Sequence, residues 1–149
     1  MNSEDVAIEL ERIEKYFFNP ENWINIELTH SWVTAQPDDA GVYMIFDDAK
    51  PVYVGETGNL RGRMRDMLDS RHHTVRRSLG EGKFSNIESY EKASSKRKHP
   101  PHIEELINST LTGYKLCRME ISFGRKEIEE HFQDKFQPSL NRKSKRKSR

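Results

Sequence analysis

The stretch GVYMIFDDAKPVYVGETGNLRGRM, residues 41–64, contains two short apolar runs that each carry one tyrosine. Both runs are rich in the β-branched and aromatic residues that favour strands. They predict a β-hairpin with strands at residues 42–46 and 51–54 and a turn over residues 47–50. The sequence therefore predicts two antiparallel strands at this point of the chain.

The register of this hairpin decides how Tyr43 and Tyr53 lie. If Phe46 pairs with Lys50, the two tyrosines are direct cross-strand neighbours, whereas pairing of Phe46 with Pro51 makes them face opposite ways. The sequence leaves both registers open. Two half-buried strand tyrosines are also explained by β-propensity without any function.

A helix is expected directly after the hairpin. Gly55 and Gly58 end the second strand, and Asn59 is placed to cap a helix over residues 60–68. On a helical wheel, the apolar side chains of this helix form one buried stripe, which comprises Leu60, Met64, Met67 and Leu68.

Two charged side chains lie at the edges of predicted apolar stripes. Arg63 is at the edge of the first stripe, whereas Arg61 and then Arg65 turn progressively toward water. On a predicted helix over residues 125–136, Glu129 is the carboxylate closest to the apolar side. A surface arginine with a packed stem and a half-exposed glutamate explain both positions without a function.

Periodicity and breaker residues predict the remaining elements. The acidic N-terminal segment places apolar residues at helical spacing, and Lys115 begins an alternating run typical of a strand. These patterns predict helices at residues 4–18, 73–79 (ended by Gly80) and 102–111, a mobile connection at 81–101, and a strand at 115–123.

Length and composition suit one compact domain of 149 residues, 34% apolar and 33% charged. No apolar run is long enough to cross a bilayer, and the acidic N-terminal sequence lacks the basic start of a secretory signal. We therefore expect no membrane partner and a cytoplasmic location. Cys117 is the single cysteine and is expected to be a buried, small apolar residue.

The net charge of +1 conceals a strong asymmetry along the chain. Residues 1–48 contain eleven acidic residues against Arg12 and Lys15, whereas residues 57–80 contain six arginines against two aspartates. The last eight residues, RKSKRKSR, add six positive charges and no acid. Such patches are typical of proteins that bind a polyanion, with nucleic acid the first candidate, although a solvated charged face explains them equally well.

Taken together, these residues resemble the GIY-YIG nuclease family. The two family motifs correspond to Gly41-Val42-Tyr43 and Tyr53-Val54-Gly55, joined by the usual short hairpin. The family arginine, eight residues after the second motif, corresponds to Arg63. The stretch IEEHFQDKFQPSLN then supplies the late positions of the family pattern, which are Glu129, Pro138 and Asn141.

The resemblance implies an α/β (α+β) fold in which a small antiparallel β-sheet with a β-hairpin is flanked by helices. It also divides the chain into three parts. An acidic N-terminal helix and loop extension would occupy residues 1–40, a GIY-YIG-like nuclease domain residues 41–141, and a basic disordered tail residues 142–149.

The function implied by the resemblance is a metal-dependent endonuclease that hydrolyses phosphodiester bonds in DNA. Glu129 would hold one divalent ion, with Mg²⁺ favoured and Mn²⁺ possible. Arg63 would contact the scissile phosphate, and Tyr43 would orient or deprotonate the attacking water. The remaining members of the implied catalytic site are Tyr53, Asn141 and either His73 or His72, with His73 slightly favoured because it begins a predicted helix.

Other arginines are expected to position the nucleic-acid backbone, namely Arg61, Arg65, Arg71, Arg76 and Arg77. The basic tail would add affinity that depends on salt and not on sequence. The alternative is a non-catalytic nucleic-acid-binding module that keeps the fold. DNA is the favoured partner, RNA stays open, and so does the choice between monomer and homodimer.

Overall fold

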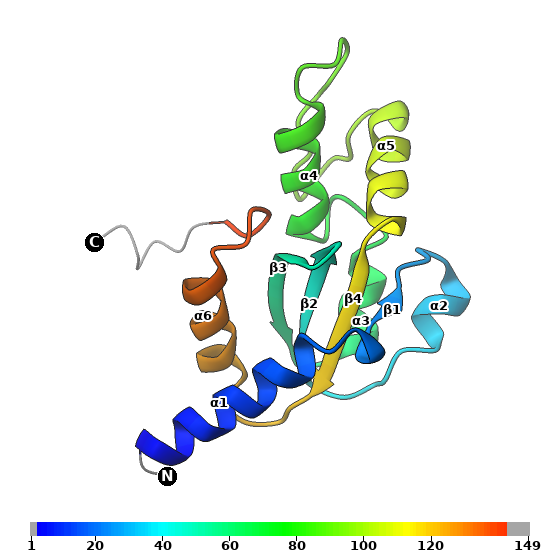
Figure 1. Ribbon diagram of the computed structural model, residues 1–149. Helices are drawn as coiled ribbons and strands as arrows, with labels where there is room; N and C mark the ends of the chain where they lie inside the picture. Colours follow the sequence, from blue (N-terminus) through cyan, green and yellow to red (C-terminus); the bar gives the residue numbers. More distant parts are fainter. Residues whose placement is uncertain (1–2, 143–149) are drawn as a thin grey trace.

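The computed structural model describes residues 3–142 and contains a four-stranded antiparallel sheet that includes the predicted hairpin (Figure 1). The strands are β1 (Ile24–Asn25), β2 (Gly41–Asp47), β3 (Lys50–Thr57) and β4 (Lys115–Glu120), in the order β1-β4-β2-β3. The helices are α1 (Ser3–Phe17), α2 (His30–Thr34), α3 (Leu60–Asp66), α4 (Thr74–Phe84), α5 (Pro101–Thr112) and α6 (Arg125–Phe136), with a short 3₁₀ helix at Pro20–Asn22. The predicted fold class is therefore confirmed. Within residues 3–142, no helix is both long and apolar enough to span a bilayer.

Helices cover both faces of the sheet, because both faces carry apolar side chains. The tyrosine face consists of Tyr43, Ile45, Val52, Tyr53 and Leu116, and it packs against apolar residues of α3, α4 and α5. The α1 face consists of Val42, Met44, Phe46, Val54 and Cys117, and it packs against α1 and α6. Figure 1 shows α1 crossing in front of the sheet, α3 behind it, and α4 and α5 rising beyond one end. Cys117 is fully buried, as predicted.

A β-bulge in the hairpin puts both tyrosines on one face. Phe46 pairs with Pro51, but Ile45 pairs with Tyr53, so Val52 has no partner on β2. The extra residue reverses the alternation of β3 at this point. The pairing of Phe46 with Pro51 was expected to turn the tyrosines apart, and the bulge is the physical reason that they lie together.

The outer edge of β3 is covered by the end of the chain that the structure describes. The Leu140 N–H donates to the Val52 carbonyl at 2.9 Å. The Asn141 amide binds both backbone groups of Val54, accepting from its N–H at 2.8 Å and donating to its carbonyl at 2.9 Å. An edge strand that would otherwise expose unpaired backbone groups is thus closed by a loop and a side chain.

Several features differ from the sequence-based predictions. Helix α4 does not end at Gly80 but continues to Phe84, and the His99 ring packs where a side chain at Gly80 would lie. Strand β4 ends at Glu120 instead of residue 123. Val6, which the helical spacing of α1 placed on its apolar side, is 44% exposed.

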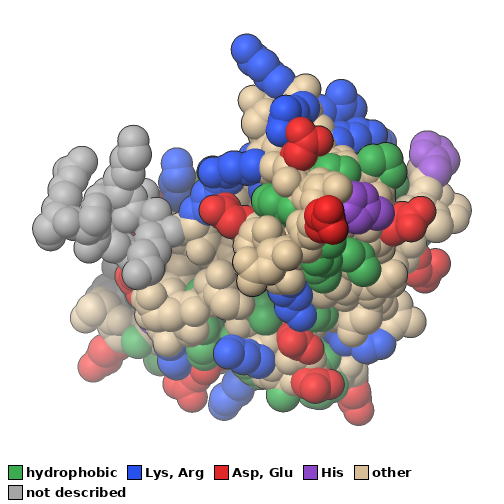
Figure 2. All heavy atoms as spheres, turned by 90° about the horizontal axis from the view of Figure 1, so that it is seen from above, with side chains coloured by type: hydrophobic (Ala, Val, Ile, Leu, Met, Phe, Trp, Pro, Cys, Tyr) green, Lys and Arg blue, Asp and Glu red, His purple; other side chains and the backbone are tan. Residues whose placement is uncertain are grey.

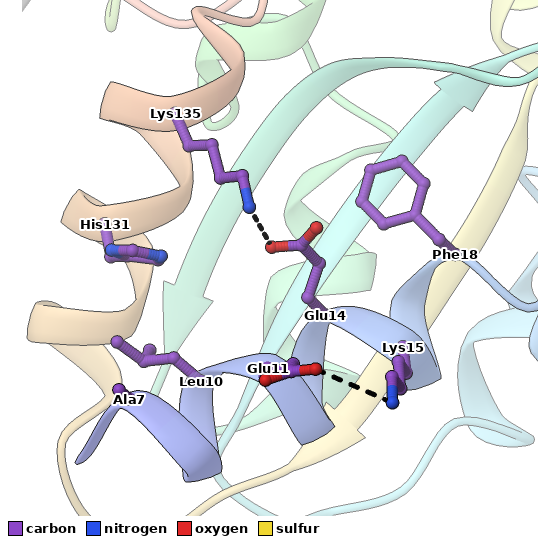
Figure 3. Close-up of a pocket in the computed structure, with 8 residues that line it drawn as sticks. All are labelled: Ala7, Leu10, Glu11, Glu14, Lys15, Phe18, His131 and Lys135. Carbon is purple, nitrogen blue, oxygen red and sulfur yellow. Dashed lines mark hydrogen bonds and ion pairs between the residues drawn. The ribbon is translucent and has the colours of Figure 1, made fainter. Parts of the chain in front are cut away.

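A hollow of about 610 Å³ separates α1 from α6 on the α1 side of the molecule (Figure 3). Leu10 and Phe18 line it from the α1 segment, and His131 and Lys135 line it from α6. Lys135 bridges the two helices through a 2.7 Å contact between its Nζ and Glu14 Oε1. The tyrosines lie on the opposite face of the sheet, so this hollow is separate from them.

Candidate active site

The hydroxyl of Tyr43 is the centre of a buried polar cluster on the tyrosine face. Its oxygen lies 2.9 Å from His73 Nε2 and accepts a hydrogen bond from Arg63 Nε at 3.3 Å. Tyr43 comes from β2, Arg63 from α3, and His73 from the residue that caps α4. Three elements that are distant in sequence therefore converge on one phenol oxygen.

The cap of α4 fixes which nitrogen of His73 carries its proton. His73 Nδ1 accepts the Val75 backbone N–H at 3.0 Å, so the neutral ring must be protonated at Nε2. Burial, assisted by the charges of Arg63, Arg77 and Arg76, holds the pKa of His73 well below its usual value. His73 is thus a neutral donor to Tyr43, and its neighbour His72 is largely exposed, with Nε2 3.8 Å from Asp69 Oδ2.

Burial also governs the ionisation of Tyr43. Enclosure of the side chain, followed by the neighbouring Tyr53, raises the pKa of Tyr43 well above its usual value, and Arg63 acts in the opposite direction. The phenol is therefore protonated near neutral pH. The two donors at its oxygen would nevertheless favour a phenolate if further positive charge arrived.

Tyr53 completes the aromatic part of the cluster. Its ring lies 6.0 Å from that of Tyr43 and 5.3 Å from that of His73. Tyr53 is 7% exposed, whereas Tyr43 is fully enclosed. Tyr53 is thus slightly less enclosed than Tyr43.

Glu129 approaches this cluster from α6. Its Oε2 accepts the Glu56 backbone N–H at 3.0 Å. Burial, followed by repulsion from the Glu56 carboxylate, raises the pKa of Glu129 to about 7. The Glu56 side chain itself pairs with Arg125, with Nε 3.3 Å from Oε2. Glu129 is therefore a half-buried carboxylate that no cation of residues 3–142 neutralises through a salt bridge.

This arrangement fits a single hard cation. Glu129 offers one carboxylate, and within residues 3–142 no group of three or more His, Cys, Asp or Glu side chains could hold a metal ion. Mg²⁺ often binds through one or two carboxylates and keeps several waters. A divalent ion at Glu129 would also relieve the unfavourable burial of its charge.

Asn141 is placed differently from the other implied catalytic residues. Its amide oxygen and nitrogen are both used by the Val54 backbone, as described above. Val54 lies between Tyr53 and Gly55 in β3, so Asn141 acts on the strand that carries the second motif. This makes it a positioning residue in the structure.

A family model for the GIY-YIG catalytic domain matches residues 39–144. The chain belongs to the GIY-YIG family. Solved structures with similar folds include the GIY-YIG N-terminal endonuclease domain of UvrC from Thermotoga maritima bound to magnesium, at 16% identity and a TM-score of 0.45, covering 75% of this chain and 93% of that one. A point mutant of the same domain, bound to its catalytic divalent cation, has 16% identity, a TM-score of 0.44 and coverage of 76% and 93%. No curated protein matches the chain.

The arginines expected at a nucleic-acid backbone differ in their availability. Arg65 is exposed, and Arg61 is partly exposed with its Nε bound to the Gln36 carbonyl at 3.0 Å. Arg71 pairs with Asp69 at 2.7 Å. Arg77 donates to the Arg71 carbonyl at 3.1 Å and is only partly buried. Figure 2 looks down on the end where α4 and α5 rise and shows Lys and Arg side chains gathered along part of that face.

The prediction that Arg76 contacts the nucleic-acid backbone is wrong, because the Arg76 side chain is buried. Its side chain is 2% exposed, and its Nη2 lies 2.5 Å from Glu104 Oε1. Its other donors bind Ser70 Oγ at 3.0 Å and the Met67 carbonyl at 3.3 Å. A guanidinium with these contacts cannot reach a phosphate, so Arg76 joins α4 to α5 instead.

Sequence reasoning missed Glu56 as part of this GIY-YIG site. Its backbone N–H holds the Glu129 carboxylate, and its side chain contributes to the raised pKa of that group. The sequence feature that could have identified Glu56 is its position directly after Gly55, where β3 continues past the second motif. Interpreting that feature required knowing that α6 packs along β3.

Proposed function

We propose that this protein is a metal-dependent endonuclease that hydrolyses phosphodiester bonds in DNA. The observation that carries the proposal is the convergence of Arg63, His73 and Tyr53 on the Tyr43 phenol, with the Glu129 carboxylate approaching from α6. Packing alone does not require a fully buried phenol oxygen with two nitrogen donors. Phosphodiester hydrolysis requires an activated water, neutralisation of phosphoryl charge and assistance to the leaving oxygen.

Glu129 is the residue that would hold the divalent ion, with Mg²⁺ or Mn²⁺ as candidates. When bound, such an ion neutralises charge on the phosphoryl oxygens and lowers the pKa of coordinated water. The Glu56 N–H fixes one oxygen of the Glu129 carboxylate and so orients the other. Glu129 is anionic at pH values above its raised pKa of about 7.

Arg63 is assigned to the scissile phosphate. Its side chain retains 24% exposure, and its Nη1 is held by Asp66 at 3.2 Å and by the His72 carbonyl at 3.1 Å. A planar guanidinium fixed in this way can present donors to phosphate oxygens. Because Arg63 Nε also donates to the Tyr43 hydroxyl, a phosphate bound by Arg63 would lie close to that phenol.

Tyr43 is assigned to orienting or deprotonating the attacking water. His73 donates to the same oxygen that would receive the proton, so it stabilises negative charge there and does not act as the base. Tyr53, which interacts with Tyr43 and is slightly less enclosed, is assigned to relaying a proton between Tyr43 and water. A phenol with a raised pKa is protonated near neutral pH and is therefore a poor base. This role requires the positive charge of a divalent ion bound at Glu129.

The test is a cleavage assay with wild type, Glu129→Ala and Glu127→Ala. Glu127 lies on the same helix but is exposed, so its variant loses the same charge away from the cluster. The substrates are supercoiled, linear, single-stranded and branched DNA and matched RNA, each with Mg²⁺, Mn²⁺ or EDTA. We expect metal-dependent cleavage of DNA that falls at least about 100-fold in Glu129→Ala and is unchanged in Glu127→Ala.

Binding measured in EDTA separates the outcomes of this assay. Nucleic-acid binding without any cleavage, unaffected by Glu129→Ala, would replace the endonuclease by the non-catalytic module. Cleavage of RNA alone would keep the chemistry and change the substrate. Cleavage that persists in Glu129→Ala would show that Glu129 does not hold the catalytic metal ion.

A further inference from the structure

Two guanidinium groups hold neighbouring carbonyls of the loop between α3 and α4. Arg63 Nη1 donates to the His72 carbonyl, and Arg77 Nη1 donates to the Arg71 carbonyl, each at 3.1 Å. The two carbonyls belong to consecutive residues. The two guanidinium groups are therefore anchored side by side, one extending from α3 and the other from α4.

Arg77 lies on the same side of its helix as the residue that binds Tyr43. His73 caps α4, and Arg77 follows it by four residues, which is one turn of a helix. The charge of Arg77 acts on His73, and Arg77 is also close enough to Tyr53 for the two side chains to interact. Arg77 thus lies at the border of the candidate active site.

Arg77 differs from its neighbours in having no acidic partner within residues 3–142. Arg63 pairs with Asp66 and Arg71 with Asp69, whereas no carboxylate pairs with Arg77. Its Nε is enclosed by protein and has no hydrogen-bond acceptor among the described residues 3–142. A buried donor without a partner is unfavourable. Because this nitrogen is enclosed, an anion would be bound by the part of Arg77 that stays accessible, since the residue as a whole is only partly buried.

Arg142 increases the positive charge at this point. Burial, followed by repulsion from Arg142 and Arg63, lowers the pKa of Arg77. Arg142 follows the loop that closes β3 and is exposed, and its charge acts on Arg77. Three guanidinium groups with one acidic partner among them create a local excess of positive charge that an anion would neutralise.

We propose that Arg77, with Arg142 beside it, binds a second phosphate group, the one that flanks the scissile phosphate held by Arg63. This inference rests on the proposed nuclease function and specifies its substrate. If each guanidinium group binds one phosphate, two successive phosphates of one strand lie beside the loop at residues 71–72, one at Arg63 and the other at Arg77. The substrate is then an internal phosphodiester bond with a phosphate on that flank, and a bond next to a strand end that lacks this phosphate is cut poorly.

The first measurement is DNA binding in EDTA over a range of salt concentrations, with wild type, Arg77→Gln, Arg77→Lys and Arg12→Gln. Glutamine retains an N–H that can bind the Arg71 carbonyl, and lysine restores the charge. Arg12 is an exposed arginine of α1 whose variant controls for net charge. We expect Arg77→Gln to weaken binding about tenfold and to lower the salt-dependence slope by about 1, with partial recovery in Arg77→Lys and no change in Arg12→Gln.

The second measurement uses a mapped cleavage site in which one flanking phosphate is a neutral methylphosphonate. Wild type should cut this substrate about tenfold more slowly, and Arg77→Gln should show no additional loss, because the contact is already absent. If the methylphosphonate lowers the cleavage rate equally in wild type and in Arg77→Gln, the inference is overturned. Arg77 would then have a structural role that does not involve the charge of the flanking phosphate. Melting temperatures confirm that each variant is folded.

The two measurements keep this inference distinct from the nuclease assignment. If no substrate is cut but Arg77→Gln still lowers the salt slope, the endonuclease proposal fails and the phosphate site stands. If DNA is cut and the slope and the methylphosphonate effect are both unchanged in Arg77→Gln, the phosphate site fails and the nuclease stands.

Discussion

A β-carbon added at Gly55 would lie 2.5 Å from Cζ and 2.6 Å from the hydroxyl oxygen of Tyr43. Gly55 is the cross-strand partner of Tyr43, and the Tyr43 ring lies directly over it. The glycine of the second motif is therefore explained by the close approach of a ring. It allows Tyr43 to extend past β3 toward His73 and Arg63.

We expect Gly55→Ala to lower the free energy of unfolding by about 1–3 kcal/mol, because an added methyl group displaces a fully buried ring. Gly58→Ala is the matched control, since a β-carbon there would meet nothing within 4 Å. Its effect should stay within about 0.5 kcal/mol. Urea unfolding of both variants makes the comparison, and equal losses at the two positions would contradict the explanation.

The raised pKa of Glu129 predicts a pH-dependent stability of the metal-free protein. A carboxyl whose folded pKa is about 7 and whose unfolded pKa is 4.5 favours folding when protonated, so this contribution is lost as pH rises from 4.5 through 7. Glu129→Gln removes that loss. In EDTA we expect it to stabilise the protein by about 1 kcal/mol at pH 8, after allowing for solvent screening of the half-exposed group, and to have no effect below pH 4.5.

The same substitution should abolish metal binding measured by calorimetry at pH 8. In wild type, the affinity for Mn²⁺ should fall about tenfold for each pH unit below 7, because the ion competes with a proton for Glu129. Thermal unfolding at several pH values checks the stability part. A Glu129→Gln protein that is less stable than wild type at pH 8 would show that the carboxylate contributes favourably in the absence of metal.

At the scale of elements, helix α4 is joined to α5 by a buried ion pair between Arg76 and Glu104. Gly80 would ordinarily weaken a helix interior by about 1 kcal/mol. Hydrogen bonding from Ser70 and the Arg76 guanidinium nevertheless outweighs burial and lowers the pKa of Glu104, whose other oxygen accepts the His99 N–H at 2.8 Å. This network ties α4, α5 and the connection between them together, and the His99 ring of that connection packs against Gly80 within α4.

Arg76→Met should therefore destabilise the fold without altering nucleic-acid recognition directly. Removing the cation leaves Glu104 buried without its charge partner, which costs about 3–5 kcal/mol. The double variant Arg76→Met with Glu104→Met should recover part of that loss, as unfolding in urea would show. The salt slope of DNA binding should be unchanged wherever the single variant is folded, and a slope lowered by about 1 would return Arg76 to the interface.

The elements themselves follow from the sequence more readily than their pairing does. Asn59 caps α3 as predicted, with its Oδ1 accepting the Gly62 N–H at 2.9 Å, because a cap depends only on neighbouring residues. The side-by-side tyrosines depend on a bulge at Val52, whose carbonyl also accepts a long-range hydrogen bond from Leu140. The burial of Arg76 likewise requires α5, which follows it by more than twenty residues. A helical wheel shows which side of a helix is apolar, but it does not show which other helix packs against that side.

At the scale of the whole molecule, charge is divided between the two sides of the sheet. The acidic helix α1 packs on the α1 face, whereas Arg63, Arg65 and Arg77 belong to helices on the tyrosine face. If the proposed nucleic-acid substrate binds on the tyrosine face, the acidic residues of α1 lie on the other side of the sheet from it. The asymmetry seen along the sequence thus becomes an asymmetry in space.

Removal of residues 143–149, which lie outside the described residues, should weaken DNA binding and reduce its salt dependence. The segment carries five positive charges, and each phosphate contact that is lost lowers the slope by about 0.9. Arg142 is retained, so the proposed phosphate site stays intact. The single-turnover cleavage rate at saturating protein should be nearly unchanged, and a large fall in that rate would assign the tail a part in catalysis.

The closure of the β3 edge has a consequence for self-association. The other edge strand, β1, pairs with only two residues of β4, whereas β3 runs for eight residues along its side of the sheet. A shortened chain that lacks Leu140 and Asn141 would expose free backbone donors and acceptors to the same strand of another copy. Leu140 and Asn141, which bind the strand of the second tyrosine motif, therefore also protect the β3 edge from strand pairing between copies. We expect shortened forms of this domain to stay monomeric in solution only if they retain these two residues.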